Sequence, residues 1–401
     1  MADNNENKVL NVPHLRFPEF SGEWNKYTIN DLATVVGGGT PDTTVKSYWG
    51  GDIQWFTPSE IGKNKYVDFS KRTITRDGLD NSSAKLLPLH TILLSSRATV
   101  GECSIASNEC TTNQGFQSLI AKQCNIDFLY YLIQTKKKDL IRNACGSTFL
   151  EISANEIRKI KVAVPVQNEQ EQIAKLLSLI DERIATQNKI IEDLKKLKSA
   201  ISKHLFARKD LLETTICLSD IATLKNGYAF QSGKYNALGK WKILTITNVP
   251  GERYINDKDC NCIIKLPNDI QDHQVLKEGD ILISLTGNVG RVSLCKNGNY
   301  LLNQRVGLLQ LAKNVDQEFL YQILSSQRFE NNMIACGQGA AQMNIGKGDV
   351  ESFVLPYSSN VNNIRLVAKI LHLYDECVIN ELRRLILLTM QKQYFLAQMF
   401  I

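Results

Sequence analysis

Polar, basic and aromatic side chains gather in two turn-rich stretches of the sequence. The first, GGGTPDTTVKSYWGGDIQWFTPSEI (37–61), places Trp49 and Trp55 close to Thr57, and the second is KNGYAFQSGKYNALGKWKILTITNV (225–249). Hydroxyl, amide and basic side chains bind the base edges and phosphates of DNA, and aromatic rings pack on its sugars and thymine methyl groups. We therefore interpret both stretches as candidate DNA-reading loops, with ordinary polar surface as the alternative for any single residue.

These stretches and the turns near them supply the residues that we predict to contact DNA. Arg97 and Arg291 suit electrostatic contact with phosphates. Asn-Gln pairs occur in both parts of the chain, so they suit a structural or phosphate-directed role. Base-reading residues are expected where the two parts differ. The full set is Thr40, Trp55, Thr57, Ser59, Arg97, Thr99, Asn113, Gln114, Lys225, Tyr228, Asn248, Thr286, Asn288, Arg291, Asn303 and Gln304.

The motifs of several enzyme classes are missing from the sequence. The nearest approach to a phosphate-binding loop, AQMNIGKGD (341–349), has Ala341 in place of the first glycine and Gly348 in place of the Ser or Thr that binds magnesium. The Pro-Pro stretch of an amino-methyltransferase is absent, and the five histidines have no spacing typical of a metal site or a catalytic triad. The sequence therefore predicts no catalytic residues and no metal site.

Composition and charge place the chain among ordinary globular proteins. It has 401 residues, 43% hydrophobic and 22% charged, which is enough for two domains. The net charge of +6 permits nucleic-acid binding. No apolar run approaches the roughly 20 residues needed to span a bilayer, and the opening MADNNENKVLN lacks the apolar core of a signal peptide, so we expect a cytoplasmic protein without membrane contact. Its ten scattered cysteines favour reduced thiols over structural zinc, despite the Cys260-x-Cys262 pair.

The chain carries a long internal repeat. FLYYLIQTKKKDLIRNACG (128–146) corresponds to FLYQILSSQRFENNMIACG (319–337), and TILLSSRATVGECSIA (91–106) corresponds to DILISLTGNVGRVSLC (280–295). Related segments lie 189–194 positions apart along nearly the whole sequence. Solenoid repeats are much shorter and recur more often, so this pattern indicates two duplicated domains.

A long helical segment follows each copy. Residues 168–207 contain neither Gly nor Pro and are rich in Leu, Ile, Lys and Glu. Asn168 is expected to cap this helix, with Glu171 completing a capping box. A helix of about 35–40 residues, at about 1.5 Å per residue, is roughly 55 Å long and suits a spacer.

The helical segments share a heptad pattern. Counted from Ile173, eight of ten a and d positions are apolar, and eight are again apolar 194 positions later. Such a seam indicates that the helices pair with each other or with partners. The polar breaks at Gln187, Lys198, Glu381 and Lys392 are either register devices or exposed positions near the edge of the seam. The predicted pairing residues are Ile173, Leu177, Ile180, Ile184, Ile191, Leu194, Val367, Leu371, Tyr374, Val378, Leu385 and Leu388.

Short apolar runs punctuated by glycines precede each long helix, which indicates mainly antiparallel β-structure. We therefore predict an α+β fold in which two β-rich domains, 1–165 and 211–357, are joined and spaced by long helices at 166–210 and 358–401. The opening residues 1–14 have no partner in the repeat, and they form either a mobile arm or part of the second domain.

Four segments together resemble the specificity subunits of type I restriction-modification systems. They are LRFPEFSGEW (15–24), the NQGF turn at Asn113, the V-x-V-P-x-x-x-E-Q-x-x-I-A stretch at 162–174 and FLAQMFI (395–401). The resemblance covers essentially the whole chain, and the duplicated layout is more specific than any one motif. In the second copy the Glu-Gln signature is replaced by PYSSNVNNIR, which puts equal docking of a partner on the two sides in doubt.

The resemblance implies two target recognition domains, each similar to the recognition domain of a DNA adenine methyltransferase, held apart by an antiparallel coiled coil with pseudo-twofold symmetry. Each domain would read one half of a gapped, bipartite site in the major groove of double-stranded DNA. Half-sites about one helical turn, roughly 34–36 Å, apart would fit this geometry. The helices would set the gap and dock two methyltransferase subunits, and restriction subunits would join the full complex.

The resemblance also implies a non-catalytic chain without a cofactor of its own. S-adenosylmethionine, ATP and Mg²⁺ would bind to the partner subunits, and the assembled complex would methylate adenine and cut DNA with ATP. Two rival hypotheses remain open. A single-chain enzyme with drifted motifs would bind S-adenosylmethionine alone, and a scaffold whose domains bind peptides would show no salt-dependent DNA binding.

Overall fold

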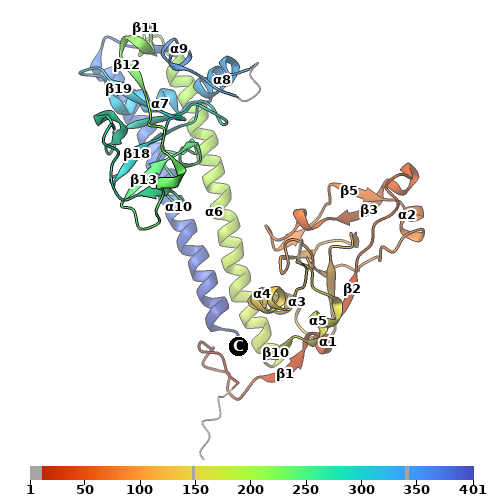
Figure 1. The fold of residues 1–401 in the computed structure, drawn as a ribbon. Coiled ribbons are helices and arrows are strands. Elements are labelled where there is room, and N and C mark those ends of the chain that lie inside the picture. The colour runs from red at the N-terminus through yellow and green to blue at the C-terminus, as the bar shows by residue number, and fades with distance from the viewer. Residues whose placement is uncertain (1–10, 147–149, 339–342) are drawn as a thin grey trace, which may run out of the picture. The chain divides into compact units, whose positions relative to one another are not determined.

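The computed structural model describes residues 11–146, 150–338 and 343–401 (Figure 1). The opening residues 1–10 and the first residues of the AQMNIGKGD stretch lie outside these ranges. The chain divides into unit 1, Met1–Asn188 with Arg384–Ile401, and unit 2, Lys189–Arg383. Within the described ranges, no helix combines the length and apolar character needed to cross a membrane.

Unit 1 contains a β-rich part, residues 25–164, that we call head 1. Its strands form a five-stranded sheet in the order β2-β9-β6-β7-β4, a three-stranded sheet in the order β5-β3-β8, and the pair β1-β10. The strands are β1 Asn25–Thr28, β2 Ala33–Gly37, β3 Trp49–Phe56, β4 Tyr66–Val67, β5 Arg72–Ile74, β6 Ile92–Leu94, β7 Cys103–Ala106, β8 Cys110–Thr112, β9 Gln117–Ala121 and β10 Lys161–Val164.

Unit 2 repeats most of this topology in residues 214–357, which we call head 2, although its two larger sheets have four strands each. Its sheets have the orders β12-β19-β16-β17, β14-β13-β18-β15 and β11-β20. The strands are β11 Thr214–Cys217, β12 Ala222–Asn226, β13 Trp241–Leu244, β14 Asn261–Ile263, β15 Val275–Leu276, β16 Ile281–Ser284, β17 Val292–Leu294, β18 Tyr300–Leu302, β19 Val306–Leu311 and β20 Val354–Tyr357. The duplicated, β-rich fold predicted from the sequence is therefore confirmed.

Corresponding helices begin with the same kind of cap. The side chain of Asn125 accepts a hydrogen bond from the Phe128 amide at the start of α3, and Asp316 does the same for Phe319 at the start of α7. Such caps satisfy backbone N–H groups that have no partner within the helix. The α-helices are α1 Ile29–Leu32, α2 Arg76–Asp80, α3 Ile126–Thr135, α4 Lys137–Arg142, α5 Ala154–Lys159, α6 Gln167–Ala207, α7 Gln317–Leu324, α8 Gln327–Cys336, α9 Lys347–Glu351 and α10 Val361–Gln398.

The two long helices, α6 and α10, pair in antiparallel fashion within each unit (Figure 1). In unit 1, Lys392 Nζ of α10 lies 2.7 Å from Asp181 Oδ1 of α6. In unit 2, Lys198 Nζ of α6 lies 2.5 Å from Asp375 Oδ1 of α10. A later residue of one helix thus meets an earlier residue of the other in both units, as an antiparallel pair requires.

All twelve predicted pairing residues are buried or half-buried. Ile173 and Leu177 also belong to the main core of head 1, and Val367 and Leu371 belong to that of head 2. The first turns of each long helix therefore join a head to the helical pair. The last turns do so too, since Leu205 of α6 belongs to the core of head 2 and Phe395 of α10 packs on the core of head 1.

The predicted cap of α6 is wrong. The helix begins at Gln167, and the amides of Glu169 and Gln170 donate to the Val166 carbonyl, so Asn168 lies inside the first turn. Tertiary contacts set this start, since the fully buried Glu169 carboxylate accepts two 2.7 Å hydrogen bonds from the Arg16 guanidinium. The side chain of Gln170 accepts the Asn125 amide and donates to the Pro165 carbonyl.

These contacts explain the Glu-Gln signature in the first turn of α6. Glu169 and Gln170 hold α6 against LRFPEFSGEW and α3, and both are buried, so they form no part of a docking surface. In the second copy, Asn363 occupies the place of Glu169 and donates to the Leu211 carbonyl. Loss of the signature in that copy therefore changes a contact inside unit 2. It gives no reason to expect that partners dock unequally on the two sides.

The segment before head 1 packs onto unit 1. Asn11 and Trp24 exchange hydrogen bonds, and the Leu15 amide donates to the Gln398 carbonyl at the end of α10. Within its described part, the opening segment is thus attached to unit 1 rather than to head 2.

Candidate nucleic-acid interface

The sheet topology brings four loops of head 1 to one edge. Strands β2 and β6 both run antiparallel to β9, so their carboxyl ends meet where β9 begins. Strands β3 and β8 are parallel, and both end beside this point. Three backbone hydrogen bonds tie the loops together: Gly39 to Thr112, Asn113 to Phe56 and Ser96 to Gly115.

Head 2 has the same edge, held by corresponding hydrogen bonds. The Tyr228 amide donates to the Leu302 carbonyl, Asn303 to Leu244, and Leu285 to Arg305. Each donor and acceptor stands at the repeat position of its counterpart in head 1. The two heads therefore present different side chains on one shared backbone frame.

Most of the predicted head 1 residues meet at this edge. The hydroxyl of Thr40 donates to the Gln114 side chain. The hydroxyls of Thr57 and Ser59 lie 3.1 Å apart. The Asn113 side chain accepts the Gly115 amide and so shapes the turn into β9. On the neighbouring loop, the Thr99 hydroxyl lies 2.9 Å from that of Ser95, and Arg97 Nε lies 3.8 Å from Glu151. Arg97 and Thr99 are exposed.

Trp55 does not fit its predicted contact role, because its side chain is buried and its indole N–H donates to the Gly39 carbonyl. Trp55 therefore supports the loop that contains Gly39. The exposed Arg72 guanidinium stacks on Trp49, 3.6 Å from the ring centroid, and Trp49 meets Trp55 edge-on. Arg72 was not among the sequence-derived candidates, because only the pairing of β3 with β5 brings it beside this stack.

The head 2 candidates divide into exposed and supporting residues. Gln304 and Asn288 are exposed, and Arg291 Nε lies 3.6 Å from Glu330. Asn248 is 4% exposed and Asn303 is 9% exposed. The Asn248 side chain accepts a hydrogen bond from the Thr245 backbone amide, and the Asn303 side chain accepts one from the Arg305 backbone amide. These two side chains therefore stabilise turns and are not directed toward a ligand.

Two further candidates do not belong to the exposed group. The Thr286 hydroxyl oxygen is buried, and among the residues that the structure describes it has no hydrogen-bond partner. Lys225 lies within β12 and lines a separate hollow with Asp272 and Asp280, so the structure does not bring it to the edge with the others.

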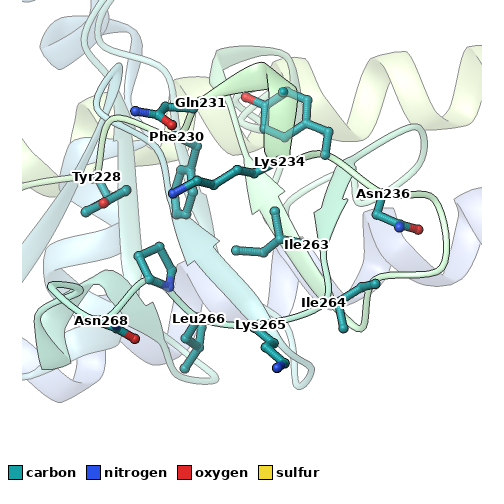
Figure 2. Close-up of a pocket in the computed structure, with 13 residues that line it drawn as sticks. Tyr228, Phe230, Gln231, Lys234, Asn236, Ile263, Ile264, Lys265, Leu266 and Asn268 are labelled. Atoms are coloured by element: carbon teal, nitrogen blue, oxygen red, sulfur yellow. The ribbon is translucent and has the colours of Figure 1, made fainter.

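A hollow of about 560 Å³ opens beside the edge of head 2 (Figure 2). The rings of Tyr228 and Phe230, with centroids 4.8 Å apart, line it together with Ile263. Figure 2 shows the Lys234 side chain extending across the hollow toward Phe230. In head 1 the residue corresponding to Tyr228 is Gly39, which residues 83–84 pack directly against. The same place in the frame is therefore filled in one head and open in the other.

A glycine approaches the Asn-Gln turn closely in both heads. A Cβ atom on Gly38 would overlap with the Asn113 carbonyl oxygen, and one on Gly227 would overlap with the Asn303 carbonyl oxygen. Only glycine allows this approach without a shift of the turn.

The cysteines and acidic residues provide no evident metal site. In the part of the chain that the structure describes, no group of three or more His, Cys, Asp or Glu side chains is arranged to hold an ion. Cys260 Sγ instead accepts a hydrogen bond from the side-chain amide of Asn248 at 3.2 Å.

Comparison with known proteins agrees with the duplicated frame. Residues 21–196 and 213–389 each match the family described as type I restriction modification DNA specificity domain. The MjaIX specificity subunit of Methanocaldococcus jannaschii is 38% identical over 192 residues, which cover 46% of this chain and 44% of that protein. The putative MjaX specificity subunit of the same organism is 24% identical over 398 residues, 92% of this chain and 91% of that protein.

The chain spans about half the length of several curated relatives that it matches, including the EcoR124I/EcoR124II specificity subunit of Escherichia coli. Among solved structures, the S subunit of a type I restriction-modification system from M. genitalium has a TM-score of 0.57 at 18% identity, covering 97% of this chain and 99% of that chain. This likeness concerns the fold. Since the family match covers most of the sequence in two copies, the chain belongs to the family of type I restriction modification DNA specificity domains.

Proposed function

We propose that this chain is the sequence-reading subunit of a type I restriction-modification complex, in which each head reads one half of a bipartite DNA site in the major groove. The observation that carries the proposal is the shared loop edge, held by corresponding backbone hydrogen bonds in both heads but lined by different side chains. A common frame with divergent residues is what two readers of different half-sites need.

The side chains at the two edges support different modes of reading. In head 1, the Arg72 guanidinium is held in a fixed plane on Trp49, which suits bidentate hydrogen bonding to guanine. In head 2, Tyr228, Phe230 and Ile263 give the hollow an aromatic and apolar wall, which suits the methyl group of thymine. The polar groups that recur in both heads, above all Gln114 and Gln304, are assigned to the DNA backbone.

Arg291 is assigned to phosphate contact. Replacement by Ala should weaken binding of the assembled complex to all sequences and reduce the slope of log K against log salt by about 1. A titration of affinity against salt measures this slope. Glu330, which lies near Arg291, provides the matched control, because Glu330→Ala should leave the guanidinium in place and the slope unchanged or steeper. A sequence-dependent effect of Arg291→Ala, with an unaltered slope, would instead assign this residue to base reading.

The paired helices are proposed to set the gap between the half-sites. Inserting about four residues in both α6 and α10 adds roughly 6 Å to each and slightly more than one turn, a small phase shift that a helical pair absorbs by local unwinding. The recognised gap should widen by a base pair or two, as mapped from the methylated motif. An unchanged gap in a complex that still methylates DNA would refute the proposal that the helices set the gap.

The helices are also proposed to dock two methyltransferase subunits, with restriction subunits completing the complex. Apolar side chains remain exposed on α10 in both units: Leu366 and Leu373 in unit 2, and Ile386, Leu387 and Met390 in unit 1. Contiguous exposed apolar residues mark protein–protein contacts. We assign S-adenosylmethionine, ATP and Mg²⁺ to those partner subunits and a non-catalytic role to this chain.

The proposal is tested by co-expressing the chain with its methyltransferase partner in a methylation-free host and mapping modified adenines by single-molecule sequencing. A two-part motif with a fixed unread gap is the expected result. No new motif, with the partner expressed and able to bind its methyl donor, would favour a scaffold that binds no DNA. Binding of S-adenosylmethionine to this chain alone would favour the single-chain enzyme.

A further inference from the structure

A buried polar cluster joins head 2 to the long helices. Arg253, in the connection between β13 and β14, has a side chain only 8% exposed. Its guanidinium donates to both oxygens of Glu318 on α7, at 2.8 and 2.6 Å, and to Asp375 on α10 at 3.0 Å. The guanidinium also lies over the ring of Tyr321, 5.1 Å from its centroid. One side chain thus links the head, its α7 helix and α10.

The same cluster extends to the second long helix. Asp375 also accepts a hydrogen bond from Lys198 of α6 at 2.5 Å and one from the side-chain amide of Gln322 at 2.7 Å. We call the group Arg253, Glu318, Tyr321, Asp375 and Lys198 the unit 2 junction. It contacts both long helices, so it fixes the head to the helical pair and not to one helix alone.

Unit 1 contains the corresponding group. Lys65 Nζ lies 2.7 Å from Asp127 of α3 and 4.9 Å from the ring centroid of Tyr131. The Tyr131 hydroxyl donates to Asp181 of α6 at 2.7 Å, and Asp181 pairs with Lys392 of α10 at 2.7 Å. We call these five residues the unit 1 junction.

Four of the five positions correspond between the two junctions, whereas Tyr131 stands at the repeat position of Gln322, whose side chain likewise donates to the aspartate on the long helix. Lys65 and Arg253 stand 188 residues apart, and each backbone carbonyl accepts a 2.7 Å hydrogen bond from a matching strand residue, Ile105 or Leu294. The aspartates on the long helices, 181 and 375, and the lysines, 198 and 392, are both separated by 194 residues. The cation and the first acid change type between the copies, from Lys with Asp to Arg with Glu. Arg253 donates directly to Asp375 of α10, whereas Lys65 donates to Ser178 of α6.

Burial of these charges is not an efficient way to stabilise the fold. Removing a charge from water is costly, and a well-packed apolar cluster usually stabilises at least as much. Burial acts to lower the pKa of Arg253, but the hydrogen bonds and charges of Glu318 and Asp375 outweigh it and raise that pKa. A buried ion pair has strict geometry, however, and is best known for selecting one arrangement among several.

We infer that each junction sets the angle at which its head is held on the helical pair, and that Arg253 and Lys65 are positioning residues that sharpen discrimination between DNA sites of different gap length. This inference rests on the proposed function. A head that tilts more freely still reads its own half-site but tolerates a gap one base pair longer or shorter.

The test uses the complex with its methyltransferase partner and DNA carrying the mapped half-sites at the native gap and at gaps one base pair shorter and longer. Arg253→Met removes the charge and keeps an apolar side chain of similar length. It should lower the methylation ratio of native to altered gaps by roughly tenfold, while base preference within each half-site stays as in the unmodified chain. The matched control, Arg253→Lys with Glu318→Asp, installs the ion pair of unit 1 and should keep the ratio.

Methylation that falls by one factor at every gap length would overturn the inference, since that is the effect of a merely structural residue. If Arg253→Met prevents assembly, Tyr131→Phe decides the question in unit 1, because it removes only the hydroxyl that binds Asp181. Its gap ratio should fall by about 3- to 10-fold, and an unchanged ratio would overturn the inference. An unmodified complex without any two-part motif would overturn the proposed function itself.

Discussion

Replacing Arg16 by Met should destabilise unit 1 by about 3–5 kcal/mol, because it leaves the Glu169 carboxylate buried without its cation. Glu169 is fully buried, and both of its oxygens accept from the Arg16 guanidinium. The Trp24 indole N–H, at 3.3 Å, is a weak substitute for that charge. For a unit of this size the loss corresponds to a fall of about 6–20 °C in the midpoint of its calorimetric transition.

The double variant Arg16→Met with Glu169→Met separates the cost of an unpaired charge from the value of the pair. Removing both partners should restore most of the lost stability, since no charge is then left buried. A double variant as unstable as the single one would mean that the Arg16–Glu169 pair itself, and not the cost of an unpaired charge, accounts for the lost stability. The transition of unit 2 should be the same in all three proteins.

Gly227→Ala should abolish reading of one half-site. Its Cβ atom would overlap with the Asn303 carbonyl, so the turn that carries Gln304 must move away from the loop edge. We expect the assembled complex to bind its full site at least about 100-fold more weakly, because loss of a half-site costs more than one mismatched base pair. Fluorescence anisotropy at fixed salt measures this loss.

A competition experiment distinguishes the loss of one half-site from a general loss of affinity. A duplex in which the half-site read by head 2 is scrambled should compete for the Gly227→Ala complex as well as the full site does. A duplex in which the other half-site is scrambled should compete less well. Gly348→Ala on α9 of the same head is the matched control, because a Cβ atom added there would meet no atom within 4 Å, and it should bind as the unmodified chain does. Equal losses at both half-sites would show that the substitution damages more than head 2.

The sequence predicted the features that depend on spacing. The repeat led to duplicated sheets, and the absence of Gly and Pro with a heptad pattern led to α6 and α10. The sequence did not decide whether the polar residues Lys198 and Lys392 in the heptad seam are register devices or exposed positions. Their side chains are only 18% exposed and form ion pairs with the facing helix, which excludes exposure as their explanation.

Features that depend on packing between distant segments were not predicted. Local capping preference assigned the start of α6 to Asn168, whereas the contact of Glu169 with Arg16 places it earlier. Side-chain type made Trp55 and Asn248 candidates for DNA contact, but type does not indicate burial, and both lie beneath the loops. No sequence signal marked Asp181 or Asp375, because each gains its partners only when a head meets both helices.

The division of unit 1 into two distant stretches of sequence has a consequence for protein synthesis. Met399 and Phe400 complete the core of head 1, where the Phe400 ring stacks on Phe128 at 5.2 Å. Unit 2 is one continuous stretch, Lys189–Arg383, and leaves the ribosome before those residues do. The head translated first is therefore completed last, because the core of head 1 lacks Met399 and Phe400 until translation has passed the end of α10.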